Sequence, residues 1–194
     1  MKQAVILHAM GQTSKGHWYP WLEKELEQRG YEVWAPDMPS PDMPNARQTT
    51  EALLMMLANK DWDIDENVVF IGHSWGAVQV LHLLQNLPPN TKVNAAVLIS
   101  AFDHPAIGME KEHAGLFQEP YDFATIKQRA KQFVFLHGSD DPWVPLEGSK
   151  NLAAQTGGTL EIVLGGQHFS TSLDPTYKEF PKLIEILEAQ NILT

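Results

Sequence analysis

Six short apolar segments recur along the chain, and stretches with helical spacing separate them. Val, Ile, Leu and Phe are frequent in these segments, which cover residues 4–8, 31–36, 67–72, 94–100, 133–138 and 159–164. Segments this short and this apolar are typical of strands buried on both faces of a parallel sheet. Their alternation with helices favours right-handed β-α-β units. The sequence therefore predicts an α/β fold, a three-layer αβα sandwich with a mainly parallel six-stranded sheet.

The intervening helices are indicated by apolar residues at helical spacing and by stop signals such as Gly30. Pro181 lies inside the last helical pattern and predicts either a kink or a later helix start. We find no repeat, linker or low-complexity stretch, so residues 1–194 are expected to form a single domain. The expected helices span residues 21–30, 46–59, 77–87, 146–158 and 175–190.

Composition narrows the classes of function. The chain of 194 residues has a net charge of −10 at pH 7 and no cysteine. The negative charge argues against nucleic acid and against an anionic membrane surface, because both bind clustered Lys and Arg. No stretch approaches the roughly 20 apolar residues that span a bilayer, and the first apolar run is too short for a signal peptide. We therefore expect a soluble protein without disulfides, cytoplasmic by default.

The stretch over residues 102–124 interrupts the alternation of strands and helices, and it carries no clear strand. Long connections in compact domains are often functional. We expect this stretch to form a loop or short helix that covers the active site. A plain surface excursion is the alternative.

The motif Gly-x-Ser-x-Gly occupies residues 72–76 and is centred on Ser74. In a nucleophile elbow, the serine lies on a strained turn between a strand and a helix, and small neighbours permit that turn. Residues 67–72 supply the expected strand and residues 77–87 the expected helix. Ser74 is therefore a candidate nucleophile, whereas the same motif without this context would be a weak signal.

A serine nucleophile requires a histidine base and an acid that orients it, in the chain order Ser, Asp or Glu, His for this architecture. His168 follows the last strand segment and is preceded by two nearby glycines. The acid is expected after the strand over residues 133–138, where Asp140 and Asp141 both qualify. Spacing alone does not separate these two aspartates. His73, beside the serine, is expected to have a packing role.

Two backbone N–H groups must bind the oxyanion that develops on the substrate. One is expected from Trp75, the residue after the nucleophile, and the other from Met10 in the loop after the first strand. The indole of Trp75 is bulky for this position, and we expect it to narrow the pocket.

Common cofactor motifs are missing from the sequence. It has no His-Glu-x-x-His, no cysteine pair and no compact cluster of histidine and carboxylate residues, so no metal is expected. The first strand segment is not followed by Gly-x-Gly-x-x-Gly, so a dinucleotide is not expected either.

Several motifs together resemble a known family. They are HWYPWLEKEL (17–26), MPSPDMPNAR (38–47), GHSWG (72–76), GSDDPWVP (138–145) and GGQHF (165–169). Together they span most of the chain, which is similar to the small α/β-hydrolases of the retinoblastoma-binding serine hydrolase family, including YdeN-like members. The resemblance implies a compact α/β-hydrolase fold and assigns the acid to Asp141, the second aspartate of the DDP motif. Ala9 departs from the glycine of many α/β-hydrolases, and we interpret HWYPW and MPSP as packing and turn elements.

The resulting hypothesis is a serine hydrolase that cleaves small esters or related acyl compounds through an acyl-enzyme on Ser74. Asp141 and His168 would complete its catalytic residues, and no cofactor is expected. The alternative is a protein-binding module on a hydrolase scaffold, because a fold does not determine a function. Nothing in the sequence indicates a protein partner, although one is possible. Candidate pocket-lining residues are Phe102, Ile107, Phe117 and Trp143.

Overall fold

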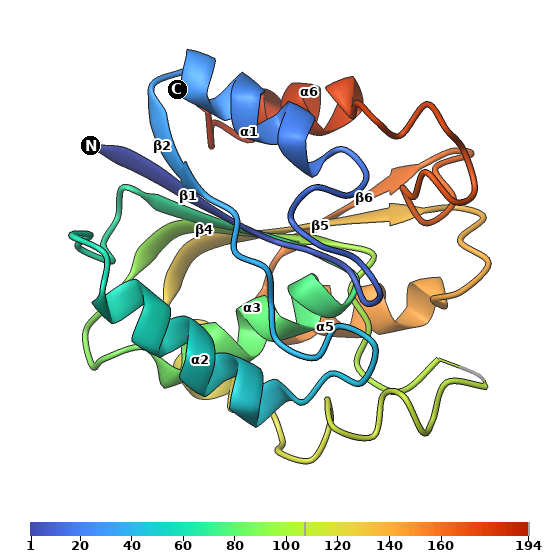
Figure 1. The fold of residues 1–194 in the computed structure, drawn as a ribbon, viewed down its shortest axis with the longest axis horizontal. Helices are drawn as coiled ribbons and strands as arrows, with labels where there is room; N and C mark the ends of the chain where they lie inside the picture. The colour runs from blue at the N-terminus through green and yellow to red at the C-terminus, as the bar shows by residue number, and fades with distance from the viewer. Residues whose placement is uncertain (107, 194) are drawn as a thin grey trace.

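A computed structural model describes residues 1–106 and 108–193 (Figure 1). The strands are β1 (Lys2–Leu7), β2 (Tyr31–Trp34), β3 (Val68–His73), β4 (Val93–Ile99), β5 (Ala130–Gly138) and β6 (Thr159–Val163). The helices are α1 (Tyr19–Gln28), α2 (Ala46–Ala58), α3 (Trp75–Asn86), α4 (Phe123–Ile126), α5 (Leu146–Thr156) and α6 (Pro181–Ala189).

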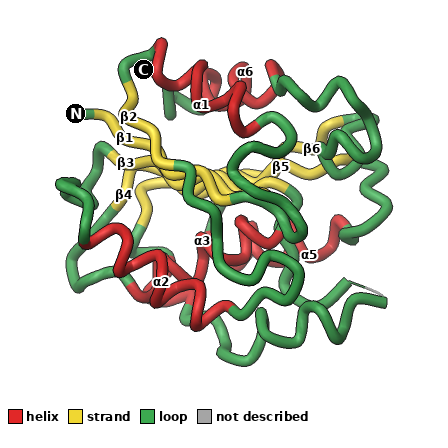
Figure 2. Tube along the Cα trace, in the orientation of Figure 1, coloured by secondary structure: helices red, strands yellow, loops and turns green. Residues whose placement is uncertain are grey.

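The strands form one six-stranded sheet in the order β2-β1-β3-β4-β5-β6, and every neighbouring pair is parallel. Helices α1 and α6 cover one face of the sheet, and α2, α3 and α5 cover the other (Figure 1). The predicted three-layer α/β sandwich is confirmed. Long loops gather where the strands end (Figure 2), the edge at which active sites form in such sheets.

Alternate residues of the central strands enter two separate cores. In β1, Val5 and Leu7 belong to the core beneath α2, α3 and α5. Ala4 and Ile6 belong to the core beneath α1 and α6. Because successive side chains of a strand point to opposite faces, this burial on both faces explains why residues 4–7 are all apolar.

Three helix starts differ from the predicted ones. α1 begins at Tyr19, with Pro20 in its first turn, where a missing N–H is tolerated. α3 begins directly after Ser74, because the turn leads into the helix without a connecting residue. α6 begins at Pro181, so the last pattern is a later helix start and not a kink. Within residues 1–106 and 108–193, no helix is long and apolar enough to cross a membrane.

The described residues of the stretch over 102–124 form irregular turns that lead to the short helix α4. Leu116 is buried in the core, and its carbonyl lies 3.0 Å from His82 Nε2 on α3. The carbonyl of Gly115 accepts a hydrogen bond from the N–H of Ala46, the first residue of α2. This part of the stretch therefore packs against α2 and α3.

Candidate active site

Ser74 lies on the turn between β3 and α3. Its φ of 55° and ψ of −116° are neither helical nor extended, and a positive φ is uncommon for a residue other than glycine. Its N–H donates to the carbonyl of Ile99 at the end of β4, 2.7 Å away. Backbone strain of this kind concentrates at functional sites, where surrounding contacts enforce it. The turn therefore has the form of a nucleophile elbow.

Gly72 and Gly76 are required by close backbone contacts around this turn. A Cβ atom at Gly72 would overlap the carbonyl of Gly76, and one at Gly76 would overlap the carbonyl of Leu7. These obstacles are backbone atoms, which cannot move aside as a flexible side chain can. The two glycines thus let α3 approach β1 and hold the serine at the start of the helix.

His168 lies in the loop after β6, between Gln167 and Phe169, which both have positive φ angles. Its Nδ1 is 2.7 Å from Asp141 Oδ2. A carboxylate only accepts hydrogen bonds, so in the neutral imidazole Nδ1 carries the proton and Nε2 does not. This is the tautomer in which a histidine can remove the proton of a serine hydroxyl.

Asp141 is surrounded by hydrogen-bond donors in the loop after β5. Its Oδ1 accepts from the N–H groups of Trp143 and Val144, at 2.9 and 3.0 Å. Its Oδ2 accepts from Ser100 Oγ at 3.0 Å and from His168. Burial raises the pKa of this carboxyl group, but the hydrogen bonds and the neighbouring His168 outweigh burial and lower the pKa overall. The side chain is therefore a fixed carboxylate at neutral pH.

The neighbouring Asp140 has a different position. It is exposed, and its Oδ1 accepts from the N–H of Gln167 at 2.9 Å. Spacing in the sequence does not decide which of the two aspartates is the acid. In the structure, Asp141 contacts the imidazole of His168, whereas Asp140 contacts the backbone of the loop that carries His168. The geometry therefore agrees with the assignment that the family resemblance implies.

The N–H groups of Trp75 and Met10 have no protein acceptor within the described part of the chain. Trp75 is the first residue of α3, so its N–H has no acceptor within the helix. The partial positive charge of a helix N-terminus also favours an anion at this position. Met10 lines the same cavity as Ser74. Both N–H groups are thus available to bind an oxyanion.

The loop that carries Met10 is held by the segment that contains the MPSP motif. The N–H of Met38 donates to His8 Nε2 at 2.8 Å. The N–H of Gly11 donates to the carbonyl of Pro41 at 2.9 Å. This motif, interpreted from sequence as a turn element, therefore also fixes the position of the loop beside the candidate nucleophile.

A cavity of about 480 Å³ lies at the carboxyl edge of the sheet and brings the three candidate catalytic residues together. Ser74, Asp141 and His168 line it, and Met109 is the described residue of the 102–124 stretch that reaches it. Ser74 Oγ makes no hydrogen bond to any described residue. The hydrogen bond between a catalytic serine and its histidine is often long without substrate and shortens when substrate binds. In the described part of the chain, no group of three or more His, Asp or Glu side chains could hold a metal ion.

The predicted pocket-lining residues have different positions. Trp143 lines the cavity, with its ring edge-on to His168 and the centroids 4.9 Å apart. Phe102 is buried in the core, with its ring centroid 5.8 Å from that of Phe117. Phe117 lines a second cavity instead. Ile107 lies outside the described residues. The two phenylalanines point away because the stretch that carries them packs toward α3.

The indole of Trp75 is completely buried in the core. It packs edge-on against His8, with ring centroids 5.6 Å apart, and it is not one of the described residues that line the cavity. The expectation that it narrows the pocket is therefore wrong. The first side chain of α3 lies in the core, where a large apolar residue fits.

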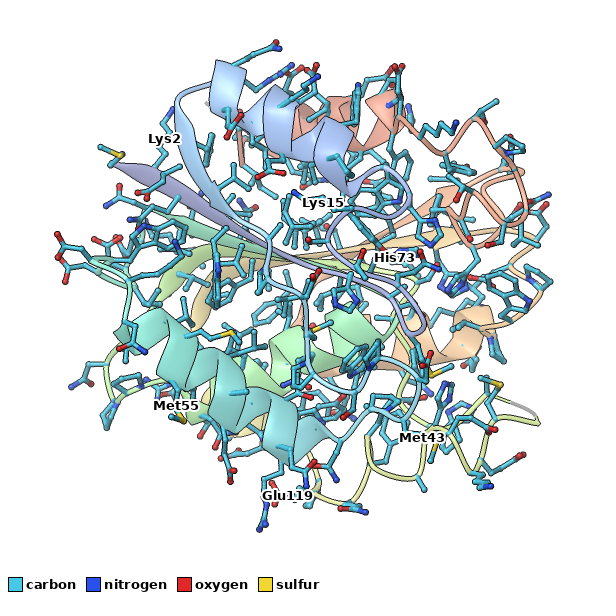
Figure 3. All side chains as sticks on the ribbon, in the orientation of Figure 1. Lys2, Lys15, Met43, Met55, His73 and Glu119 are labelled. Atoms are coloured by element: carbon cyan, nitrogen blue, oxygen red, sulfur yellow. The ribbon has the colours of Figure 1, made fainter. Side chains whose placement is uncertain are left out.

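His73, which is labelled in Figure 3, connects the loop after β1 to the loop that carries His168 through a buried chain of hydrogen bonds. The N–H of Ala9 donates to the hydroxyl of Tyr19 at 3.0 Å, and that hydroxyl donates to His73 Nδ1 at 2.7 Å. His73 Nε2 is 2.8 Å from the carbonyl of His168, to which it donates. Burial, and then the nearby His168, hold the pKa of His73 well below its usual value. The packing role expected for this histidine thus includes positioning the loop of His168.

His17 and Trp18 of the HWYPW motif form further bonds to the same loop. Trp18 Nε1 donates to the carbonyl of Phe169 at 3.0 Å. The N–H of Thr171 donates to His17 Nδ1 at 3.2 Å. The interpretation from sequence, packing and turn elements, did not include these bonds to the loop of His168. The available signal was a histidine and two aromatic residues at the start of the helix, where His17 and Trp18 precede it and Tyr19 is its first residue.

Because several histidines are shielded from water, we expect the free energy of unfolding to depend on pH. Burial lowers the pKa of several of them, so they stay neutral in the folded protein when the unfolded chain starts to bind protons near pH 6.5. The free energy of unfolding should therefore fall as the pH drops from 7 to 5, by up to about 1.4 kcal/mol per pH unit for each histidine that stays neutral. Urea unfolding at a series of pH values measures this. The histidines concerned are His8, His17, His73, His82, His113 and His137.

The carboxyl groups titrate in the unfolded chain near pH 4, below this window, and the histidines are already neutral above pH 7. The histidines should therefore contribute a much smaller change in stability between pH 7 and 8 than between pH 7 and 5, which serves as the internal control. A constant urea midpoint between pH 7 and 5 would contradict the assignment of neutral, buried imidazoles.

A parallel six-stranded sheet with a serine on the strained turn between β3 and α3 defines an α/β-hydrolase. The sequence pattern of the serine hydrolase family matches residues 4–189, so the chain belongs to the serine hydrolase family.

Two curated proteins and a solved structure are similar over nearly their whole length. YdeN of Bacillus subtilis (strain 168) is 29% identical over 188 residues, which cover 96% of this chain and 94% of that protein. Serine hydrolase RBBP9 of Rattus norvegicus is 28% identical over 181 residues, which cover 92% and 89%. The crystal structure of the B. subtilis ydeN gene product matches with a TM-score of 0.87 and 27% identity, covering 97% of this chain and 98% of that one. The resemblance inferred from the motifs is thus confirmed.

Proposed function

We propose that this serine hydrolase cleaves small esters or related acyl compounds through an acyl-enzyme on Ser74. One observation carries the proposal: a serine on a strained elbow and a histidine bonded through Nδ1 to a buried carboxylate line one cavity. Backbone strain and a buried charge both destabilise a fold. Their presence together at one cavity therefore supports a role in the chemistry.

In the first half of the reaction, Ser74 Oγ attacks the carbonyl carbon of the ester, and its proton passes to His168 Nε2. The negative charge that develops on the carbonyl oxygen is bound by the N–H groups of Trp75 and Met10. The bond to the alcohol oxygen then breaks, and His168 gives its proton to the departing alcohol. Asp141 holds the imidazole in position and stabilises its positive charge throughout.

In the second half, a water molecule attacks the acyl carbon and His168 Nε2 takes the proton of this water. The bond between the acyl carbon and Ser74 Oγ breaks, and the proton returns to the serine oxygen. The products are the carboxylic acid and the free enzyme, and no cofactor takes part in either half.

Cavity size supports small substrates. A volume of about 480 Å³ lies in the lower part of the range for small-molecule sites, and Met10, Met109 and Trp143 supply apolar contacts. We expect p-nitrophenyl acetate and butyrate to have kcat/KM values at least tenfold above that of p-nitrophenyl dodecanoate, because the longer chain cannot be enclosed. Release of p-nitrophenolate followed by absorbance measures this. Absence of turnover for all of these esters would contradict the proposed function, and a preference for the dodecanoate would contradict the small-substrate class.

A further inference from the structure

The lining of the cavity includes polar side chains that the proposed chemistry does not use. They are Gln12, His17, Ser170 and Ser172. The described lining residues include no Lys or Arg, and the only charged side chain among them is the carboxylate of Asp141. This part of the cavity therefore suits uncharged polar groups of a substrate better than anionic ones.

The tautomer of His17 follows from its contacts. Thr171 donates its backbone N–H to His17 Nδ1 at 3.2 Å, and Thr171 Oγ1 lies 2.9 Å from the same nitrogen. An N–H group can only donate, so Nδ1 is unprotonated. Burial, and then the nearby His168, lower the pKa of His17 to about 4, so its ring is neutral at pH 7. The single ring proton is therefore on Nε2, and this N–H has no acceptor among the described residues.

His17 is also held in a conformation that suggests a function. Its φ of 47° lies in the left-handed region, which is unfavourable for a residue with a side chain. Its ring centroid is 5.8 Å from that of His73, which in turn is 5.1 Å from that of His168. Strained backbone concentrates at ligand-binding positions. The strain and the contacts with Thr171 fix an imidazole close to His168 with a free donor.

We propose that His17 Nε2–H binds an uncharged oxygen in the alcohol part of the substrate, so that the preferred substrates are esters of alcohols carrying a second, neutral oxygen. The inference rests on the proposed function, in which His168 protonates the departing alcohol. That alcohol must therefore lie against His168, and His17 lines the same cavity as His168. The unpaired N–H selects an acceptor such as a hydroxyl or ether oxygen and disfavours an ammonium group.

A pair of esters tests this directly. 2-Methoxyethyl butyrate and n-butyl butyrate both have four chain atoms in the alcohol part, and they differ by one oxygen in place of one methylene. For each ester, kcat/KM is divided by the rate constant of its alkaline hydrolysis. We expect this normalised value to be about tenfold higher for the methoxyethyl ester than for the butyl ester. A hydrogen bond to a partly buried donor is worth about that factor. Release of acid in a pH-stat measures both rates.

Substitutions at position 17 assign the preference to the imidazole. His17→Phe keeps a planar ring without the N–H, and the normalised ratio should fall close to 1. His17→Gln restores an N–H donor and should recover part of the preference. His104→Gln, at an exposed histidine that is not among the described lining residues, should keep the wild-type ratio.

The possible outcomes are distinct. A wild-type ratio near 1 would overturn the inference even if the butyrates are hydrolysed rapidly, and so would an unchanged ratio in His17→Phe. Should that variant not fold, the wild-type ratio and the His17→Gln variant still decide. If the wild-type protein hydrolyses neither butyrate nor p-nitrophenyl acetate, the proposed function fails and the inference fails with it.

Discussion

Replacing Ser74 with alanine should lower kcat for p-nitrophenyl acetate by about 10⁴-fold or more and leave the protein folded. The hydroxyl is the proposed nucleophile, and no other described side chain occupies the same turn to replace it. The oxygen makes no hydrogen bond to any described residue, so its removal leaves no protein group unpaired. Initial rates, together with the urea unfolding midpoint, measure both parts of the expectation.

Ser139→Ala is the matched control for this variant. Ser139 is an exposed serine in the loop after β5, and its Oγ accepts from the N–H of Gly165. Its removal should change kcat by no more than about twofold, since surface substitutions have small effects. Equal rates for Ser74→Ala and the wild-type protein would contradict the mechanism, and equal losses in both variants would indicate a general effect on folding.

Replacing Asp141 with asparagine should lower kcat by about 10⁴-fold, because an amide at this position can donate to Nδ1 and so favours the wrong tautomer of His168. Asn has nearly the same shape, so the contacts with the N–H groups of Trp143 and Val144 can persist through the amide oxygen. The initial rates should therefore fall much more than the unfolding midpoint.

Asp140→Asn separates the two aspartates. Asp140 is exposed and accepts from the N–H of Gln167, a contact that an amide oxygen can also make. We expect its kcat to stay within about threefold of the wild-type value, since the loop keeps its bond. The opposite pattern, with the larger loss at position 140, would contradict the assignment of the acid to Asp141.

The sheet could be predicted because burial on both faces leaves a signal within each strand. Residues 68–72 are all apolar or glycine, and β3 is buried at every position. The residues at which helices begin were predicted less accurately, since they depend on the backbone conformation of the preceding turn. The start of α3 at Trp75, for example, follows from the positive φ of Ser74, which no local preference of serine predicts.

The candidate catalytic residues could be found because their chemistry restricts their types and their order along the chain. Spacing narrowed the acid to Asp140 or Asp141 and no further, because both follow the same strand. The choice depends on which carboxylate turns inward, and the N–H groups of Trp143 and Val144 determine that in the folded loop.

The lining of the cavity was predicted less well, because it depends on how loops pack. Phe102 and Phe117 are aromatic residues of a long connection, but that connection packs toward α3 and only Met109 of its described residues reaches the cavity. His17 was not predicted to line the cavity, since its position depends on a left-handed backbone and on contacts with residues more than 150 positions away.

Labelling with a fluorophosphonate tests the central claim, an activated Ser74, most directly. The reagent phosphonylates a serine whose proton is removed by a histidine and whose oxyanion site is formed. We predict one stoichiometric adduct on the peptide that contains Ser74, found by mass spectrometry, with none in Ser74→Ala and unchanged labelling in Ser139→Ala. Absence of labelling in the folded wild-type protein, or an adduct on another serine, would contradict the claim and favour a protein-binding role on a hydrolase scaffold.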